Sequence, residues 1–343
     1  MRQRLLHRAV ARLLTVVAVC VAAVGVAAVP AQARPLSEHD RIVAFWTNER
    51  VAKAVPRDFV FDASTQHFVQ MGKPGGGGGG GGGSTTTVLG ASWIKGGAVL
   101  SASGKVLFAM GSSYYVCSAA VVTDNKSTRS IILTAGHCVW DPATGFATNW
   151  MFIPDYDSNP VGLDRSGTFC ASTTYGCWTA SSLVVSNTFA SESGFTTTAT
   201  QHDYAFAVVG GGGKSGTAQL DATVGSFAIS YTARTSGTDS YLFGYPASQK
   251  YKGKDLTYSR GPLGFDPNTS NTTYRVASDM TGGCSGGPWF SSFDETTGSG
   301  TLMSVNSYGY SGVTALHGPI LNTETSNMFT AATNATVNTR YGA

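Results

Sequence analysis

The stretch Thr281 to Phe290, TGGCSGGPWF, places one hydroxyl group among glycines. Glycine is used where the backbone must bend sharply or approach another group closely. A loop with so few Cβ atoms can present the Ser285 hydroxyl and point backbone N–H groups into the same space. A serine nucleophile beside an oxyanion hole needs this arrangement. The alternative is a glycine-rich turn that contains a serine by chance, since the chain has 43 glycines.

A serine hydroxyl is a poor nucleophile until a base takes its proton, so a histidine is required. Five histidines lie beyond the first 33 residues: His39, His67, His137, His202 and His317. His137 stands in SIILTAGHCVW, at the end of an apolar strand, where a scaffold can hold an imidazole rigidly. A bridge between Cys138 and Cys117, in the upstream strand VCSAAVV, would lock this loop, and such loops are typically stabilised by about 3 kcal/mol.

The composition excludes several classes of function. The chain has 343 residues, a formal charge of +3 and 13% charged residues, and no basic stripe lies beyond its first residues. Neither nucleic-acid binding nor an acidic partner is indicated. Abundant glycine, serine and threonine with little lysine are typical of a β-rich secreted protein.

The N-terminus predicts export. Four arginines among the first twelve residues precede an apolar run, Leu13 to Val29, and the small-x-small signal Ala31-Gln32-Ala33. Residues 1–33 are therefore predicted to be a secretory signal peptide, which leaves a secreted protein with no membrane contact after its removal. An uncleaved membrane anchor is the alternative, and the Ala-x-Ala site argues against it.

Export makes disulfide pairing the expectation for the cysteines. Cys20 leaves with the signal peptide, and five cysteines remain: Cys117, Cys138, Cys170, Cys177 and Cys284. Because five is odd, one thiol is left over or bonds another molecule. No CxxC pair occurs, which argues against a structural zinc site.

The chain divides at a run of nine glycines, Gly75 to Gly83, which predicts a flexible linker. Residues 34–74 before it carry charges and helix formers, and Thr47 to Val55 could form a short helix that Pro56 ends. Residues 84–343 after it alternate β-forming runs with turn residues, which predicts an all-β sandwich or barrel. This length is large for one barrel and comfortable for two, and Gly210 to Gly213 is a plausible crossover.

Together LTAGHC and GGCSGGP resemble the chymotrypsin-like (trypsin-fold) serine proteases, in particular the bacterial secreted branch with trypsin-like and glutamyl-endopeptidase-like enzymes. The resemblance covers roughly residues 88–340 and includes FGYPA, Phe243 to Ala247. It implies two antiparallel Greek-key β-barrels, at about 88–210 and 214–340, with the active site in the cleft between them.

The family requires an aspartate between the histidine and the serine. QHDYAFAVV offers Asp203 at the head of an apolar strand, although an ordinary strand-end cap is the alternative. Its competitors stand in loop-like sequence: Asp141, Asp155, Asp157 and Asp164. His202 is then interpreted as an exposed neighbour.

The resemblance implies a mechanism without a metal or an organic cofactor. His137 would take the proton of Ser285 as it attacks a peptide carbonyl, and Asp203 would hold the imidazole ring. The backbone N–H groups of Gly283 and Ser285 would form the oxyanion hole. The expected partners are protein or peptide substrates, and the expected state is a monomer.

Cys284 departs from the animal-type enzymes, where an aspartate precedes the nucleophile and pairs with a new N-terminus after activation. A cysteine cannot form that ion pair, so latency could instead come from residues 34–74 acting as a pro-region. The alternative is that this segment is an N-terminal arm that stays with the mature protein. If Cys170 and Cys177 pair, Cys284 is the odd thiol, buried beside the active site. A Cys284 nucleophile, as in viral relatives, is the alternative, but Ser285 holds the family's position.

The specificity residues are inferred from the resemblance. Asp279, six residues before Ser285, would attract Arg or Lys before the scissile bond, or it caps a loop. Met280 would narrow such a pocket. Glutamate-selective relatives carry a histidine where this chain has Asn306. The edge that pairs with the substrate backbone would be Ser307, Tyr308 and Gly309.

The sequence thus predicts a secreted serine endopeptidase. A preference for Arg or Lys before the scissile bond is a further expectation. The alternatives are a catalytically inactive, protease-like binding protein, a glutamate-selective endopeptidase, or a β-sandwich that carries these motifs by coincidence.

Overall fold

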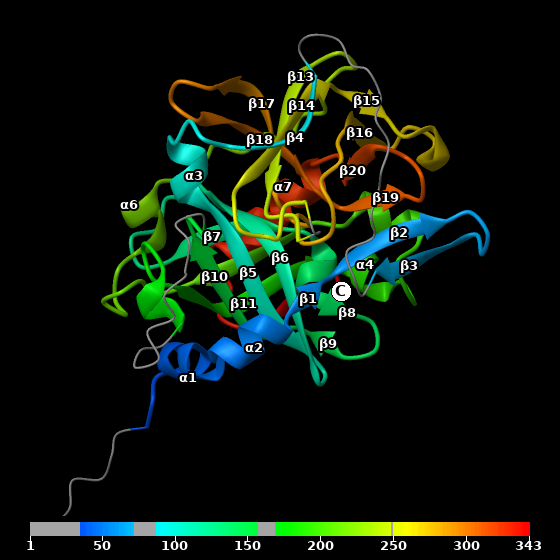
Figure 1. Cartoon of the computed structure of the whole chain (residues 1–343). Coiled ribbons are helices and arrows are strands. Elements are labelled where there is room, and N and C mark those ends of the chain that lie inside the picture. The colour runs from blue at the N-terminus through cyan, green and yellow to red at the C-terminus, as the bar shows by residue number, and fades with distance from the viewer. Residues whose placement is uncertain (1–34, 72–86, 157–168, 248–249) are drawn as a thin grey trace, which may run out of the picture. The chain divides into compact units, whose positions relative to one another are not determined.

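The first half of the protease region folds into a closed six-stranded barrel, seen in the computed structural model of the chain (Figure 1). Its strands are β5 (Ser103–Met110), β6 (Ser113–Val122), β7 (Ser130–Thr134), β10 (Thr148–Pro154), β11 (Trp178–Ser186) and β12 (Ala205–Val209). They pair in the order β6-β5-β10-β11-β12-β7, and β7 pairs again with β6. Every residue of β7 and β12 is buried, because these continuous apolar runs face packed neighbours.

The second half contains two sheets. One has the order β18-β17-β13-β14-β4, and the other includes β15, β16, β20 and β19. The bounds are β4 (Val88–Ser92), β13 (Asp239–Gly244), β14 (Thr257–Pro262), β15 (Gly264–Phe265), β16 (Thr273–Ala277), β17 (Pro288–Asp294), β18 (Ser299–Val305), β19 (Tyr308–Tyr310) and β20 (Ala315–Pro319). Because β14 contacts β16 and β18 contacts β20, the sheets enclose a second core around Leu242, Trp289 and Met303. The predicted all-β fold with two barrels is confirmed.

Both ends of the protease region cross to the opposite half. The first strand, β4, pairs with β14 rather than with the first barrel. The last elements, α7 (Thr323–Ala332) and β21 (Thr339–Tyr341), contact β11 of the first barrel. The expected division into 88–210 and 214–340 therefore needs correction at its outer ends. Local alternation predicts a strand but does not specify which edge it pairs with.

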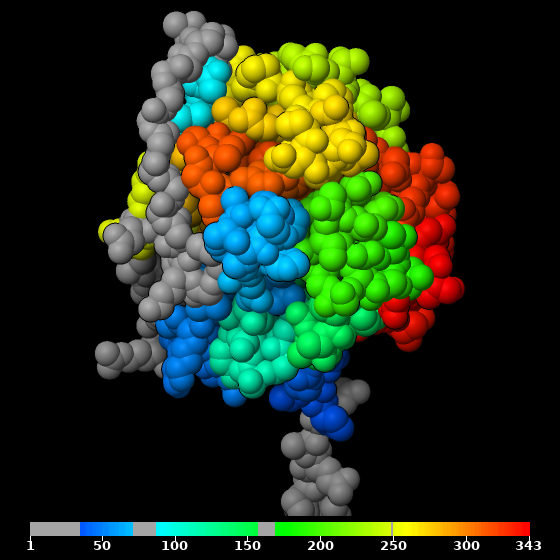
Figure 2. Space-filling view, turned by 90° about the vertical axis from the view of Figure 1, so that its right-hand side faces the viewer, coloured from blue at the N-terminus to red at the C-terminus, as the bar shows by residue number. Residues whose placement is uncertain are grey.

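Residues before the polyglycine run form five elements: α1 (Glu38–Phe45), α2 (Asn48–Lys53), β1 (Val55–Pro56), β2 (Asp58–Asp62) and β3 (His67–Met71). The Thr47 side chain caps α2, and the helix ends before Pro56, close to the predicted bounds. β1 runs parallel to β6, and the β2–β3 hairpin extends the sheet of β19 (Figure 1). Figure 2 shows this blue hairpin seated against green atoms of the first half and orange atoms of the second.

Short elements fill the connections: α3 (Ala98–Ala102), η1 (Gly136–Cys138), β8 (Trp140–Asp141), β9 (Gly145–Phe146), η2 (Phe169–Ser172), α4 (Asn187–Ser191), α5 (Thr197–Gln201), α6 (Leu220–Val224) and η3 (Pro267–Thr269). Two disulfides are present, Cys117–Cys138 and Cys170–Cys177, and the thiol of Cys284 is free and buried. These are the pairings that the sequence analysis favours.

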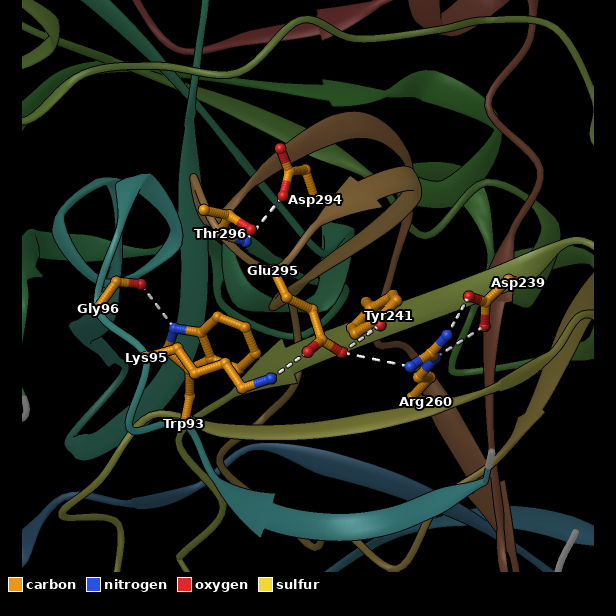
Figure 3. A network of polar contacts seen from close by, with 9 residues as sticks. All are labelled: Trp93, Lys95, Gly96, Asp239, Tyr241, Arg260, Asp294, Glu295 and Thr296. Carbon is orange, nitrogen blue, oxygen red and sulfur yellow. Dashed lines mark hydrogen bonds and ion pairs between the residues drawn. The ribbon is translucent and has the colours of Figure 1, made fainter. Parts of the chain in front are cut away.

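A polar network ties the loop after β4 to the strands of its sheet (Figure 3). Glu295 accepts a hydrogen bond from the Tyr241 hydroxyl and forms ion pairs with Lys95 and with Arg260, the latter at 3.3 Å. Arg260 also pairs with Asp239 at 2.9 Å. Because these groups are partly exposed, the network contributes modestly to stability.

The structure describes residues 35–71, 87–156, 169–247 and 250–343. The predicted signal peptide and polyglycine linker lie outside these ranges. Within them, none of the helices combines the length and the apolar character that spanning a membrane would need.

Candidate active site

His137 and Asp203 form a buried pair. His137 lies in η1, directly after β7, and the bridge from Cys138 to Cys117 fixes this turn to β6. Nδ1 of His137 lies 2.8 Å from Oδ2 of Asp203, and the backbone N–H of His137 donates to Oδ1 at 2.8 Å. Ser307 donates a third hydrogen bond to Asp203, at 2.5 Å. Three donors thus fix the orientation of this carboxylate, which in turn orients the imidazole ring.

The loop around Ser285 needs its glycines for conformation and for space. Gly283 and Gly286 have φ angles of +99° and +78°, a region that other residues rarely adopt. A Cβ on Gly287 would lie 2.1 Å from the carbonyl oxygen of Phe243. The Ser118 N–H donates to the carbonyl of Ser285 at 2.7 Å, which anchors the loop to β6. The glycines therefore place Ser285 where the two halves of the molecule meet.

The Ser285 hydroxyl is bonded to a residue that the sequence analysis did not single out. Its Oγ donates to Oδ1 of Asp58 in β2 at 2.7 Å, and the N–H of Gly283 donates to the same oxygen at 3.1 Å. Nε2 of His137 has no hydrogen-bond partner among the described residues. Burial raises the pKa of Asp58, although the bond from Ser285 and the nearby His137 oppose this effect. No local signal in RDFVFD marks Asp58, because its role depends on a partner far along the chain.

The N-terminal segment also covers the imidazole. The Phe59 ring packs edge-on against His137 at 5.4 Å and stacks on Phe195 at 4.2 Å. Nε of Arg57 donates to the carbonyl of His137 at 2.7 Å, and its Nη2 pairs with Asp141 at 2.7 Å. As a result His137 is 1% exposed and Ser285 3%.

The other aspartates and His202 have other partners or lie outside the described ranges. Asp141 pairs with Arg57, and Asp157 and Asp164 are not among the described residues. His202 lies 2.9 Å from Glu324, and hydrogen bonding to His202 lowers the pKa of Glu324 to about 2. His202 is thus a half-buried hydrogen-bond partner of Glu324 rather than an exposed neighbour.

The residues expected to set specificity fall into two groups. Ser307, Tyr308 and Gly309 lie at or beside β19, and β2 already pairs with this edge. Asp279 instead forms an ion pair with Lys250 at 2.7 Å and accepts a hydrogen bond from the Tyr251 hydroxyl. Met280, next to it, is buried.

Asn306 has a structural role. Its Nδ2 donates to the carbonyl oxygens of Phe243 and Cys284 at 2.8 and 2.9 Å, and its Oδ1 accepts from Trp289 at 2.6 Å. These bonds use its polar groups inside the core, so the residue is not free to bind a substrate side chain.

Two alternatives, a cysteine nucleophile at Cys284 and a metal site beside His137, conflict with the structure. Burial raises the pKa of the Cys284 thiol well above its usual value, and the charge of Asp58 adds to this, which makes the thiol a weak nucleophile. Cys117, His137 and Cys138 cluster within 4.8 Å, a spacing that could hold a metal ion. The two sulfurs are joined in a disulfide, however, so they cannot serve as thiolate ligands.

No protein-family model matches the sequence, and no curated protein matches it. Two solved structures do. The protease Anisep from Arthrobacter nicotinovorans is 32% identical, with a TM-score of 0.57, over 69% of this chain and 97% of that one. The thermostable serine protease AL20 from an extremophilic microorganism is 31% identical, with a TM-score of 0.56, over 69% of this chain and 100% of that one. With this similarity and the two-barrel fold, the chain belongs to the chymotrypsin-like serine proteases and is a serine-type endopeptidase.

Proposed function

We propose that this endopeptidase is exported and hydrolyses peptide bonds with Ser285 as nucleophile, His137 as general base and Asp203 as the residue that orients the imidazole. The observation that carries the proposal is the buried pair of His137 and Asp203 at 2.8 Å, together with a serine on a glycine loop. The two disulfides are in keeping with an extracellular location.

The reaction follows from the positions of these groups. Nε2 of His137 takes the proton of the Ser285 hydroxyl as Oγ attacks the substrate carbonyl carbon. The Gly283 N–H, with that of Ser285, stabilises the negative oxygen that forms. His137 then protonates the leaving amine, and water releases the acyl group by the reverse sequence. Asp203 stabilises the imidazolium through its hydrogen bond with Nδ1 of His137.

We propose that Asp279 gives the enzyme a preference for substrates with Arg or Lys before the scissile bond. Its carboxylate is the negative group that would attract such a side chain, and it lies in the loop that leads to Ser285. Its ion pair with Lys250 must open or rearrange first, because one carboxylate would otherwise serve two cations. The proposed substrates are proteins or peptides, and the proposed state is a monomer.

The test is peptide hydrolysis and fluorophosphonate labelling of the secreted protein. Ser285→Ala should lower turnover by a factor on the order of 10⁶ and abolish the adduct. Ser291→Ala is the matched control, because Ser291 is also a buried serine of the second half. Labelling that persists in Ser285→Ala would contradict the assignment, and absence of labelling from every form would favour an inactive binding protein.

A further inference from the structure

One carboxylate oxygen contacts two groups that a scissile peptide would have to reach. Oδ1 of Asp58 accepts hydrogen bonds from both Oγ of Ser285, at 2.7 Å, and the N–H of Gly283, at 3.1 Å. These are the proposed nucleophile and a proposed oxyanion-hole donor. An oxygen atom that contacts both groups must be displaced before a scissile peptide can reach Ser285.

We propose that residues 55–71 are a built-in inhibitor of this site, and that Asp58 is the residue that blocks it. The proposal rests on the proposed function of Ser285 and His137. It assigns a partner to the substrate-binding edge: a segment of the same chain, held there by a carboxyl group.

The blocked state is unreactive for a chemical reason. The Ser285 hydroxyl gives its hydrogen bond to Asp58, so its proton is directed away from His137, whose Nε2 has no partner among the described residues. The Asp58 side chain offers no amine leaving group, so attack of Oγ on its carboxyl carbon cannot lead to cleavage of a peptide bond. The nucleophile is thus satisfied by a group that it cannot cleave.

The backbone of the segment also occupies the expected substrate edge. β2 pairs with β19 in parallel, with Phe59 opposite Tyr308 and Val60 opposite Gly309. An extended substrate that adds a strand to this edge would need the same backbone groups of β19. Inhibitor and substrate therefore exclude each other.

Two side chains hold the segment in this position. Arg57 is 3% exposed, and it bonds the His137 carbonyl and Asp141, both at 2.7 Å, on the first half. Phe68 of β3 contacts Phe195 of the first half at 5.2 Å and Tyr308 of the second at 5.4 Å. Because the segment grips both halves, its docking does not depend on Asp58 alone.

The test measures how fast a fluorophosphonate labels Ser285 on the full-length chain, with intact mass excluding trimmed forms. Asp58→Ala should label about tenfold faster or more, because the hydrogen bond that directs the Ser285 proton away from His137 is lost. Asp62→Ala is the matched control, since Asp62 lies on the same strand and bonds only its own turn in the described structure. It should label at the wild-type rate. Equal rates for Asp58→Ala and wild type would overturn the inference while leaving the endopeptidase assignment intact.

Hydrogen exchange of β2 provides a readout that does not depend on activity. In the wild type the β2 amides should be protected, and Arg57→Met should expose them by removing the contacts with His137 and Asp141. Loss of protection in Arg57→Met without labelling of any variant would contradict the proposed function but not the docking. Unprotected β2 amides in the wild type would overturn the inference.

Discussion

Oγ of Ser285 lies 2.7 Å from Oδ1 of Asp58, although 227 positions separate the two residues in the sequence. The same carboxylate oxygen accepts the N–H of Gly283. The hydroxyl that the glycine loop presents is therefore engaged by the N-terminal segment rather than by His137.

Removing the charge of Asp203 should impair the chemistry rather than the fold. Asp203→Asn can keep the shape of the site but cannot accept the same three hydrogen bonds, so the imidazole loses its fixed tautomer. We expect kcat to fall by a factor of about 10⁴ with little change in Tm. Steady-state kinetics would check this, with the exposed Asp255→Asn as control. A fall of less than tenfold would contradict the role given to Asp203.

Asp279 should control the preference for basic side chains. Asp279→Asn should lower kcat/KM for peptides with Arg or Lys before the scissile bond by about tenfold or more relative to neutral peptides. Lys250→Met should have the opposite effect, because it frees the carboxylate from its ion pair. Competing hydrolysis of matched peptides would measure both. An unchanged ratio in Asp279→Asn would leave Asp279 as a loop residue.

Docking of the N-terminal segment should weaken as the pH rises. Burial raises the pKa of Asp58 in the docked state, so docking is favoured by its protonated form. The stabilisation of the docked state by the protonated carboxyl group is fully present below the pKa of a free aspartate, about 3.9. It is lost as the pH rises through the raised pKa of docked Asp58. His137, Arg57 and Cys284 are the other titratable groups that act on or are affected by this carboxyl.

Hydrogen exchange of β2, corrected for intrinsic rates, would follow this effect between acidic and neutral pH. Asp58→Asn should flatten the profile, because an amide does not titrate in this range. Protection that increases with pH in the wild type, or an identical slope in Asp58→Asn, would show that another group controls the docking.

Cys284 should be unreactive in the folded protein. Its thiol is buried and its pKa is raised well above the usual value, so little thiolate is present at neutral pH. We expect iodoacetamide to modify it only after unfolding, and Cys284→Ala to keep the activity within about threefold. Mass spectrometry before and after denaturation would measure the first. Complete loss of activity in a folded Cys284→Ala protein would instead support the cysteine as nucleophile.

The sequence alone determined the parts of the site whose signals are local. The glycines beside Ser285 mark it, because positive φ angles and close backbone contacts at those positions require glycine. His137 is marked by its place at the end of an apolar strand, next to a cysteine. Asp203 needed one step more, because several aspartates lie between His137 and Ser285 in the sequence, and Asp203 was chosen for its place just before the apolar run of β12.

The tertiary structure decided what depends on pairing between distant segments. The crossing of β4 and β21 to opposite halves, and the docking of β2 on β19, are choices of sheet edge that alternation in one strand does not encode. Asp58 belongs to this class. Its carboxyl becomes a partner of Ser285 only after both barrels and the parallel β2–β19 pairing have formed, because only then do the two residues share one buried site.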